Sequence, residues 1–167
     1  MDLEFPNLPY LIDGETKITE TIGIMQYIAK KYRPALLGAN AAEMGRISML
    51  ADKVLALKGN ATKACYMVGD AEAIIDEARP VLAKIVEAMG DSDWIAGANL
   101  TWLDFYFAEI LDMLHEISDG LFYAEFQSLQ GYWDRFVSLP NLGDAWTDDS
   151  KLMKAPFNNK MAKLLNC

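Results

Sequence analysis

Signals for β-structure occur only near the start of this chain, and this distribution constrains the fold more than any other feature. Residues 10–12 have strand character, and Asp13-Gly14 is a strong hairpin turn signal. Glycine tolerates positive φ there, and an aspartate side chain can bond its own backbone. A return strand over about 17–19 is expected to pair with the first strand. The chain therefore begins with a small hairpin.

The remainder of the chain has helical periodicity. An amphipathic helix is predicted over 20–32, with Thr19 as its cap and Arg33-Pro34 as its end. Pro80 predicts a kink or a break in a later helix. Beyond a linker at 34–41, helices are expected at about 42–67, 71–89, 103–117, 123–138 and 143–151, with a last turn or two within 156–167. The fold class is therefore an α/β piece at 1–33 followed by an all-helical domain at 42–167.

Composition restricts the classes of function. The 167 residues are 52% hydrophobic, which is enough for a real core, and the net charge of -9 disfavours nucleic acid as a partner. No apolar run approaches the roughly 20 residues of a membrane span. The first residues lack the features of a secretory signal. Two cysteines do not make a disulfide framework, so we expect reduced thiols and a cytoplasmic protein.

The sequence does not match the motifs that indicate a metal site or a catalytic nucleophile. The single histidine, His115, has no neighbouring histidine or cysteine, so a packed or surface role is expected and no metal site is predicted. The sequence has no Gly-rich phosphate loop, no nucleophile elbow and no Cys-x-x-Cys motif.

The hairpin and the helix after it carry the best candidate chemistry. A cis Leu8-Pro9 bond would turn the Leu8 backbone outward to pair with the peptide unit of a ligand, although an ordinary edge-strand proline is an equal alternative. The start of the next helix favours an anion. Thr21 offers it a hydroxyl, and Glu20 could accept from an ammonium group. The alternative for these two residues is plain helix capping.

Thr101 and Asp104 resemble a capping box, with Asp at the third helical position where Glu or Gln is usual. We interpret this pair as a device for folding and stability, because a cap satisfies backbone donors at the start of a helix.

These motifs, in this order, resemble the glutathione transferases, and most closely the mu class. The segments that carry the resemblance are Leu3-Glu4-Phe5-Pro6-Asn7-Leu8-Pro9-Tyr10-Leu11-Ile12-Asp13-Gly14, Lys17-Ile18-Thr19-Glu20-Thr21, Tyr27-Ile28-Ala29, Cys65-Tyr66, Trp94-Ile95-Ala96-Gly97, Thr101-Trp102-Leu103-Asp104-Phe105, Phe136 and Leu139-Pro140-Asn141-Leu142. The resemblance implies a thioredoxin-like, glutathione-binding domain at 1–33, a helical C-terminal domain, and a dimer. It also implies glutathione as co-substrate, with no cofactor, and a small apolar electrophile as the second substrate.

The resemblance also implies individual roles. Asn7, Leu8 and a cis Pro9 are expected to bind the glutathione backbone. Glu20 and Thr21 take the places of a Gln-Ser pair that holds the γ-glutamyl end. Two further residues match by position. Tyr66 matches an auxiliary tyrosine at the electrophile site, and Phe5 matches an aromatic residue that inserts into the partner subunit.

The sequence departs from the family pattern at two places. It begins just before the family's third strand, so the first strand, first helix and second strand have no counterpart, nor has the tyrosine that stabilises the glutathione thiolate. An acidic residue that reaches glutathione from the neighbouring subunit aligns with Ala56. Three explanations stay open: a true protein that extends upstream, a partner chain that covers the sheet edge, or a loosely held small domain.

Two functions are therefore predicted as alternatives. One is conjugation of glutathione to small hydrophobic electrophiles. The other is a non-catalytic interaction or structural subunit of a larger assembly, built on the same fold.

Overall fold

The computed structural model describes residues 3–140, 142 and 157–165, and it confirms the N-terminal hairpin. Strand β1 (Tyr10–Asp13) pairs antiparallel with β2 (Thr16–Thr19), with Tyr10 opposite Thr19. Gly14 has a φ of 61°, the left-handed conformation that a two-residue turn of this kind requires. Helix α1 (Thr21–Tyr32) follows directly and packs against both strands.

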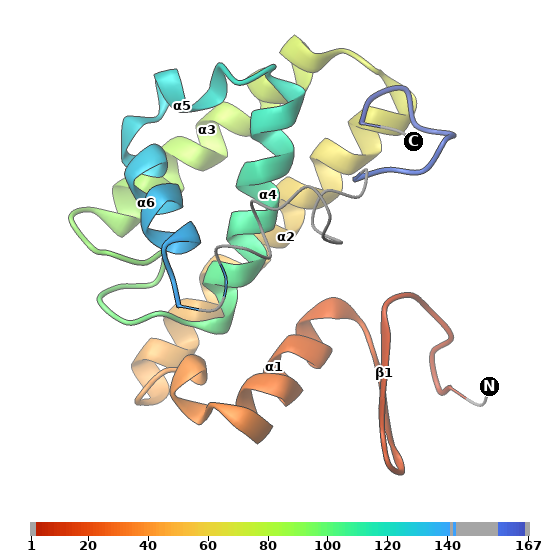
Figure 1. Ribbon diagram of the computed structural model, residues 1–167, viewed down its shortest axis with the longest axis vertical. Helices are drawn as coiled ribbons and strands as arrows, with labels where there is room; N and C mark the ends of the chain where they lie inside the picture. Colours follow the sequence, from red (N-terminus) through yellow and green to blue (C-terminus); the bar gives the residue numbers. More distant parts are fainter. Residues whose placement is uncertain (1–2, 141, 143–156, 166–167) are drawn as a thin grey trace.

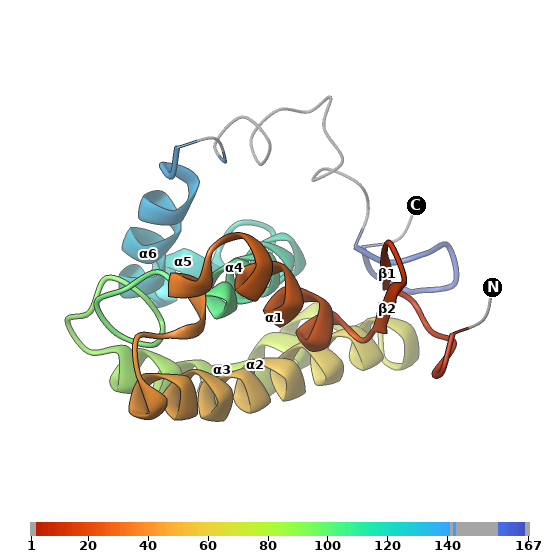
Figure 2. The same ribbon diagram turned by 90° about the horizontal axis from the view of Figure 1, so that it is seen from below.

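The helical domain lies beyond a single 3₁₀ turn, η1 (Pro34–Leu37). Figure 1 shows α1 and the hairpin below the bundle formed by the later helices, and Figure 2 shows α2 and α3 side by side along one face of it. The helices of this domain are α2 (Ala41–Met67), α3 (Ala71–Met89), α4 (Trp102–Ile117), α5 (Phe122–Glu125) and α6 (Gln127–Val137).

Helix α4 is the centre of the core. It contacts α1, α2, α3, α5 and α6, and its side chains are apolar on nearly every face, as expected of a helix surrounded by others. Its fully buried residues include Leu103, Phe107, Ala108, Ile110, Leu111 and Leu114.

The start of α4 is fixed by one buried carboxylate. Asp104 Oδ2 accepts bonds from the backbone N–H and the hydroxyl of Thr101, at 2.7 and 2.9 Å. Its Oδ1 accepts from the Ile95 N–H at 2.9 Å and from the Tyr132 hydroxyl at 3.1 Å. Burial raises the pKa of Asp104, and these bonds act in the opposite direction. The predicted capping pair is therefore present, and it also joins the 95–101 loop to α6.

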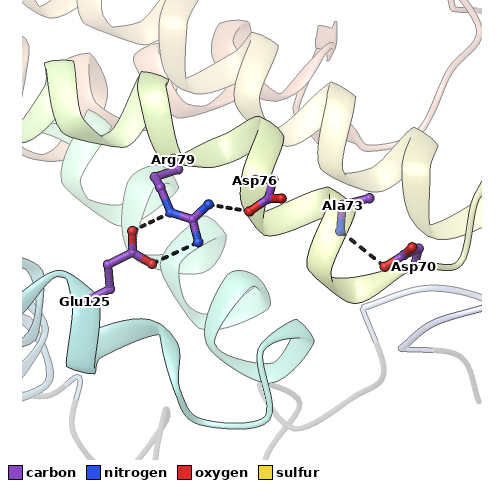
Figure 3. A network of polar contacts seen from close by, with 5 residues as sticks. All are labelled: Asp70, Ala73, Asp76, Arg79 and Glu125. Carbon is purple, nitrogen blue, oxygen red and sulfur yellow. Dashed lines mark hydrogen bonds and ion pairs between the residues drawn. The ribbon is translucent and has the colours of Figure 1, made fainter.

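Caps and ion pairs fix the other helices. Asn40 Oδ1 caps α2 by accepting from the N–H groups of residues 42 and 43, both at 3.0 Å. Figure 3 shows the equivalent cap of α3, in which Asp70 accepts from the Ala73 N–H at 3.2 Å. In the same view, Arg79 of α3 forms a two-point ion pair with Glu125 of α5 and also contacts Asp76. This ion pair holds the short helix α5 against α3.

The structure corrects several details of the sequence-based expectations. Thr19 does not cap α1, because it belongs to β2, and Glu20 occupies the cap position without a side-chain cap bond. The predicted helix over 123–138 is two helices, α5 and α6, separated at Phe126, whose φ of -114° and ψ of 70° are not helical. The Phe126 ring packs against the Phe122 ring at 5.3 Å between centroids.

Two other expectations concern α3 and the C-terminal region. Helix α3 continues through Pro80 without a break, although the proline removes one backbone donor from the helix. The described part of the tail, residues 157–165, makes turns and bends instead of helix. The helix predicted at 143–151 lies outside the described residues.

Candidate functional site

The loop that precedes β1 presents its backbone and its apolar side chains to solvent. The Leu8-Pro9 peptide bond is cis, as the family resemblance implied. Leu8 is 78% exposed and Phe5 is 68% exposed, so neither side chain belongs to the core.

Asn7 and Glu20 are brought together from the two ends of the hairpin. Asn7 Nδ2 donates a 2.7 Å hydrogen bond to Glu20 Oε1. Glu20 has a φ of 69° and a ψ of 127°, a conformation that is uncommon for a residue with a side chain. Such strained residues are concentrated at functional sites, where the surrounding structure holds them. The bond leaves the second carboxylate oxygen of Glu20 available for a ligand cation.

Thr21 is the first residue of α1 and is half-buried. The first N–H groups of a helix have no partner within it, and they give its N-terminus a partial positive charge. Glu20 directly precedes this helix start, so the two candidate residues are adjacent at the N-terminus of α1.

A cluster that the sequence analysis missed holds the hairpin turn on α1. Asp13 accepts from the Tyr27 hydroxyl at 3.0 Å and forms an ion pair with Lys31. The Lys31 ammonium is the main cause that lowers the pKa of Asp13, and the Tyr27 hydroxyl is the second. The signal that could have shown it is the i, i+4 spacing of Tyr27 and Lys31, which places both side chains on one face of α1.

Tyr66 lies on another part of the molecule, at the C-terminal end of α2. Its hydroxyl oxygen accepts a hydrogen bond from the Asn159 N–H at 3.3 Å. The Lys163 N–H donates to the Cys65 carbonyl oxygen at 2.8 Å, so residues 157–165 lie over the end of α2. The adjacent Cys65 side chain is fully buried, and burial raises the pKa of its thiol.

Metal chemistry finds no support in the described part of the chain. Within it, no three histidine, cysteine, aspartate or glutamate side chains are grouped so that they could hold an ion. Among the described residues, no helix is long and apolar enough to cross a membrane.

Comparison with known proteins identifies the family. Residues 48–140 match the family model described as glutathione S-transferase, C-terminal domain. Glutathione S-transferase Mu 3 of Homo sapiens is 34% identical over 167 residues, which cover 98% of this chain and 72% of the relative. Glutathione S-transferase Mu 5 of Mus musculus is 31% identical over 166 residues, with the same coverage.

The solved structures agree on the fold. The crystal structure of the glutathione S-transferase Blo t 8 superimposes with a TM-score of 0.84 over 96% of this chain and 77% of that one, at 22% sequence identity. The chain belongs to the glutathione S-transferase family. The two relatives named above are of the mu class, and the hairpin and α1 of this chain correspond to part of a thioredoxin-like domain in front of the family's helical domain.

Proposed function

We propose that the protein binds glutathione at the hairpin and supports its conjugation to small hydrophobic electrophiles. The observation that carries the proposal is the Asn7–Glu20 hydrogen bond of 2.7 Å, because it unites the loop before β1 with the start of α1. The Leu8 backbone then pairs with the peptide of the ligand. The γ-glutamyl end lies at Glu20 and Thr21, with its ammonium at the Glu20 carboxylate and its carboxylate at the start of α1.

Conjugation also requires activation of the glutathione thiol. A free thiol has a pKa near 8.5, so only a few per cent of it is thiolate at neutral pH, and thiolate is the nucleophile. A hydroxyl hydrogen-bonded to the sulfur would raise the thiolate fraction, and turnover depends on that fraction.

Tyr66 is the auxiliary residue at the electrophile site in this proposal. Its oxygen accepts from Asn159 and its proton remains free to donate to the oxygen of an epoxide or an enone, where charge develops in the transition state. Tyr66→Phe should lower the rate with such acceptors and leave retention on glutathione unchanged. A loss of retention would show that Tyr66 belongs to the glutathione site instead.

Retention on immobilised glutathione tests the binding site. Asn7→Ala and Glu20→Ala should each abolish retention, whereas Glu20→Gln should only weaken it, because its amide oxygen can still accept from Asn7 but its amide nitrogen cannot accept from the ligand ammonium. Thr21→Ser should likewise bind and Thr21→Ala should not. Glu15→Ala is the matched control, since Glu15 is an exposed carboxylate on the same hairpin. Equal retention by Glu20→Ala and Glu15→Ala would exclude the proposed site.

The proposal also includes a dimeric state and a cytoplasmic location. Phe5 is exposed as an aromatic residue must be if it inserts into a second subunit, and Phe5→Asp should reduce the dimer fraction in sedimentation. The cytoplasm is the location in which glutathione and the two cysteines stay reduced. Detoxification is the role that fits the family.

A non-catalytic subunit of a larger assembly is the second candidate function. The specific observation that favours it is the exposed apolar surface of the N-terminal unit, where Tyr10 and Ile12 of β1 are 42% and 47% exposed. A wild-type protein that folds, fails to bind glutathione resin and shows no conjugation of a chloronitrobenzene would support this function and exclude the first.

A further inference from the structure

Residues 158–165 form a closed loop beside the C-terminal end of α2, drawn in blue in Figure 1. The two ends of the loop are tied together by Asn158. Its backbone N–H donates to the Leu165 carbonyl oxygen and its Nδ2 donates to the Leu164 carbonyl oxygen, both at 3.0 Å. Asn158 and Ala162 are buried, so the loop has a small packed interior. A loop closed in this way is held as one unit, and its attachment to α2 decides where its groups lie.

Lys163 fastens this loop to the last turn of α2 with two hydrogen bonds. Its backbone N–H donates to the Cys65 carbonyl oxygen at 2.8 Å, and its Nζ donates to the Met67 carbonyl oxygen, also at 2.8 Å. The last carbonyl groups of a helix have no partner within the helix, and they carry partial negative charge. The Lys163 ammonium therefore gains both a hydrogen bond and a favourable interaction with the helix dipole.

Gly69 leaves the space that Lys163 occupies at this junction. It lies just beyond the end of α2 and has a φ of 72°, a conformation that favours glycine. A Cβ atom at this position would lie 2.6 Å from Lys163 Cβ and 2.8 Å from Lys163 Cδ, closer than carbon atoms pack. The approach of the loop to α2 therefore depends on the missing side chain of Gly69 as well as on Lys163.

We propose that Lys163 is a positioning residue for Tyr66, which acts by holding the 158–165 loop on α2. The two carbonyl groups that accept from Lys163 belong to the residues on either side of Tyr66. The Asn159 N–H of the loop donates to the Tyr66 hydroxyl oxygen at 3.3 Å. This distance is already long for such a bond, so a small displacement of the loop breaks it and frees the hydroxyl to turn. The inference rests on the proposed role of Tyr66 at the electrophile site.

Hydrogen exchange tests the attachment without any substrate. Lys163→Met keeps the methylene groups and the backbone N–H but loses the ammonium, so the hydrogen-bonded amides of residues 158–165 should exchange about fivefold faster. Lys163→Arg should restore the wild-type rate, because a guanidinium can donate to the same carbonyl oxygen. Lys160→Met is the matched control, since Lys160 is an exposed lysine of the same loop. Equal exchange in Lys163→Met and Lys160→Met would overturn the proposal.

Gly69→Ala tests the close approach of the loop to α2. It should speed exchange of the loop amides more than Lys163→Met does, because the added methyl group displaces Lys163. Gly90→Ala is the matched control. Gly90 also ends a helix with a positive φ, of 55°, but a Cβ there would meet no described atom within 4 Å. Both variants therefore carry the strain of a positive φ, and only Gly69→Ala adds the collision. Wild-type exchange of the loop in Gly69→Ala would contradict the inference.

Kinetics test the effect on Tyr66. Lys163→Met should lower kcat with an enone acceptor at least about threefold, since a misplaced donor stabilises the transition state less well. Retention on immobilised glutathione and turnover of a chloronitrobenzene should stay near the wild-type level. In a Tyr66→Phe background, Lys163→Met should cause no further loss, because the hydroxyl that it positions is gone. Equal losses with both acceptors, or in both backgrounds, would show a general structural role and overturn the proposal.

The two measurements separate this inference from the proposed function. A wild-type protein that conjugates no acceptor would contradict the proposed function and, with it, the catalytic part of this inference. Exchange of the 158–165 amides does not depend on turnover, so it would still decide whether Lys163 holds the loop against α2.

Discussion

The hairpin unit, residues 10–37, and the helical domain differ in how deeply their residues are buried. Within the elements β1, β2, α1 and η1, all of which lie in the described part of the chain, Ala29 is the single buried residue. Helix α4, in contrast, is buried along most of its length, and its cap is a carboxylate with no exposed surface. The proposed glutathione site is therefore built on the weakly packed unit, and the densely packed unit serves as its support.

The two regions therefore have different roles. Residues that bind a ligand from a loop need exposed backbone, so they cannot lie in a core. The hairpin is positioned by polar contacts between side chains, such as Asn7 with Glu20 and Asp13 with Lys31, which contribute little individually at an exposed position. The helical domain gains its stability from buried apolar area.

The largest test removes the cap of α4. Asp104→Ala should lower the free energy of unfolding by at least about 3 kcal/mol, since each buried donor left without a partner costs roughly 1–3 kcal/mol. Those donors are the Thr101 and Ile95 N–H groups and the hydroxyls of Thr101 and Tyr132. Urea unfolding measures the loss, with the exposed Asp91→Ala as control. A loss below about 1 kcal/mol would remove the basis for treating the helical domain as the stable unit.

Hydrogen exchange tests the comparison itself. Amides of β1 and β2 should exchange at least about 100-fold faster than those in the middle of α4, because local opening of a small exposed unit costs less than global unfolding. Comparable protection of the two regions would mean that the hairpin opens only when the whole protein unfolds.

A milder change at the same cap sharpens the first test. Thr101→Ala should cost about 1 kcal/mol, because it removes the hydroxyl bond to Asp104 and leaves the backbone N–H bond in place. Urea unfolding again provides the measurement. A cost equal to that of Asp104→Ala would show that the two bonds do not act separately.

The smallest expected effect is a loss of hairpin stability at acidic pH. The pKa of Asp13 is lower in the folded protein than in the unfolded chain, so its contribution to stability is present above its unfolded pKa and is lost as pH falls through the folded value. Between pH 6 and pH 3, the protection factors of the hairpin amides, corrected for the intrinsic exchange rate at each pH, should therefore fall in the wild type. This acid response should be absent in Asp13→Asn and unchanged in Asp91→Asn; an identical response in all three proteins would contradict the role of Asp13.

Local signals in the sequence predicted the elements well. The Asp13-Gly14 turn, the long helices and the Thr101–Asp104 cap depend on residues within a few positions of one another, and all are present. The division between α5 and α6 was missed because Phe126 has a non-helical backbone conformation, with a φ of -114° and a ψ of 70°. Helical periodicity in the sequence alone does not show such a break between two helices.

The candidate site was predicted in part. Asn7 and Glu20 were both selected, yet the hydrogen bond between them follows only from the fold of the hairpin. Whether Leu8, Pro9 and Thr21 contact glutathione, and whether Phe5 contacts a partner, stay predictions that the binding experiments address.

The sequence by itself determined the family, the hairpin, the helical periods and the residue types offered to a ligand, because each depends on short-range patterns or on motif order. The tertiary structure decided which distant groups meet. Asn159 reaches Tyr66 across 93 positions of the chain, and Arg79 reaches Glu125 across 46. It also decided that α1 and α4 leave an open apolar groove between them. These features depend on how the helices pack, and packing is the sum of many weak contacts that no local pattern specifies.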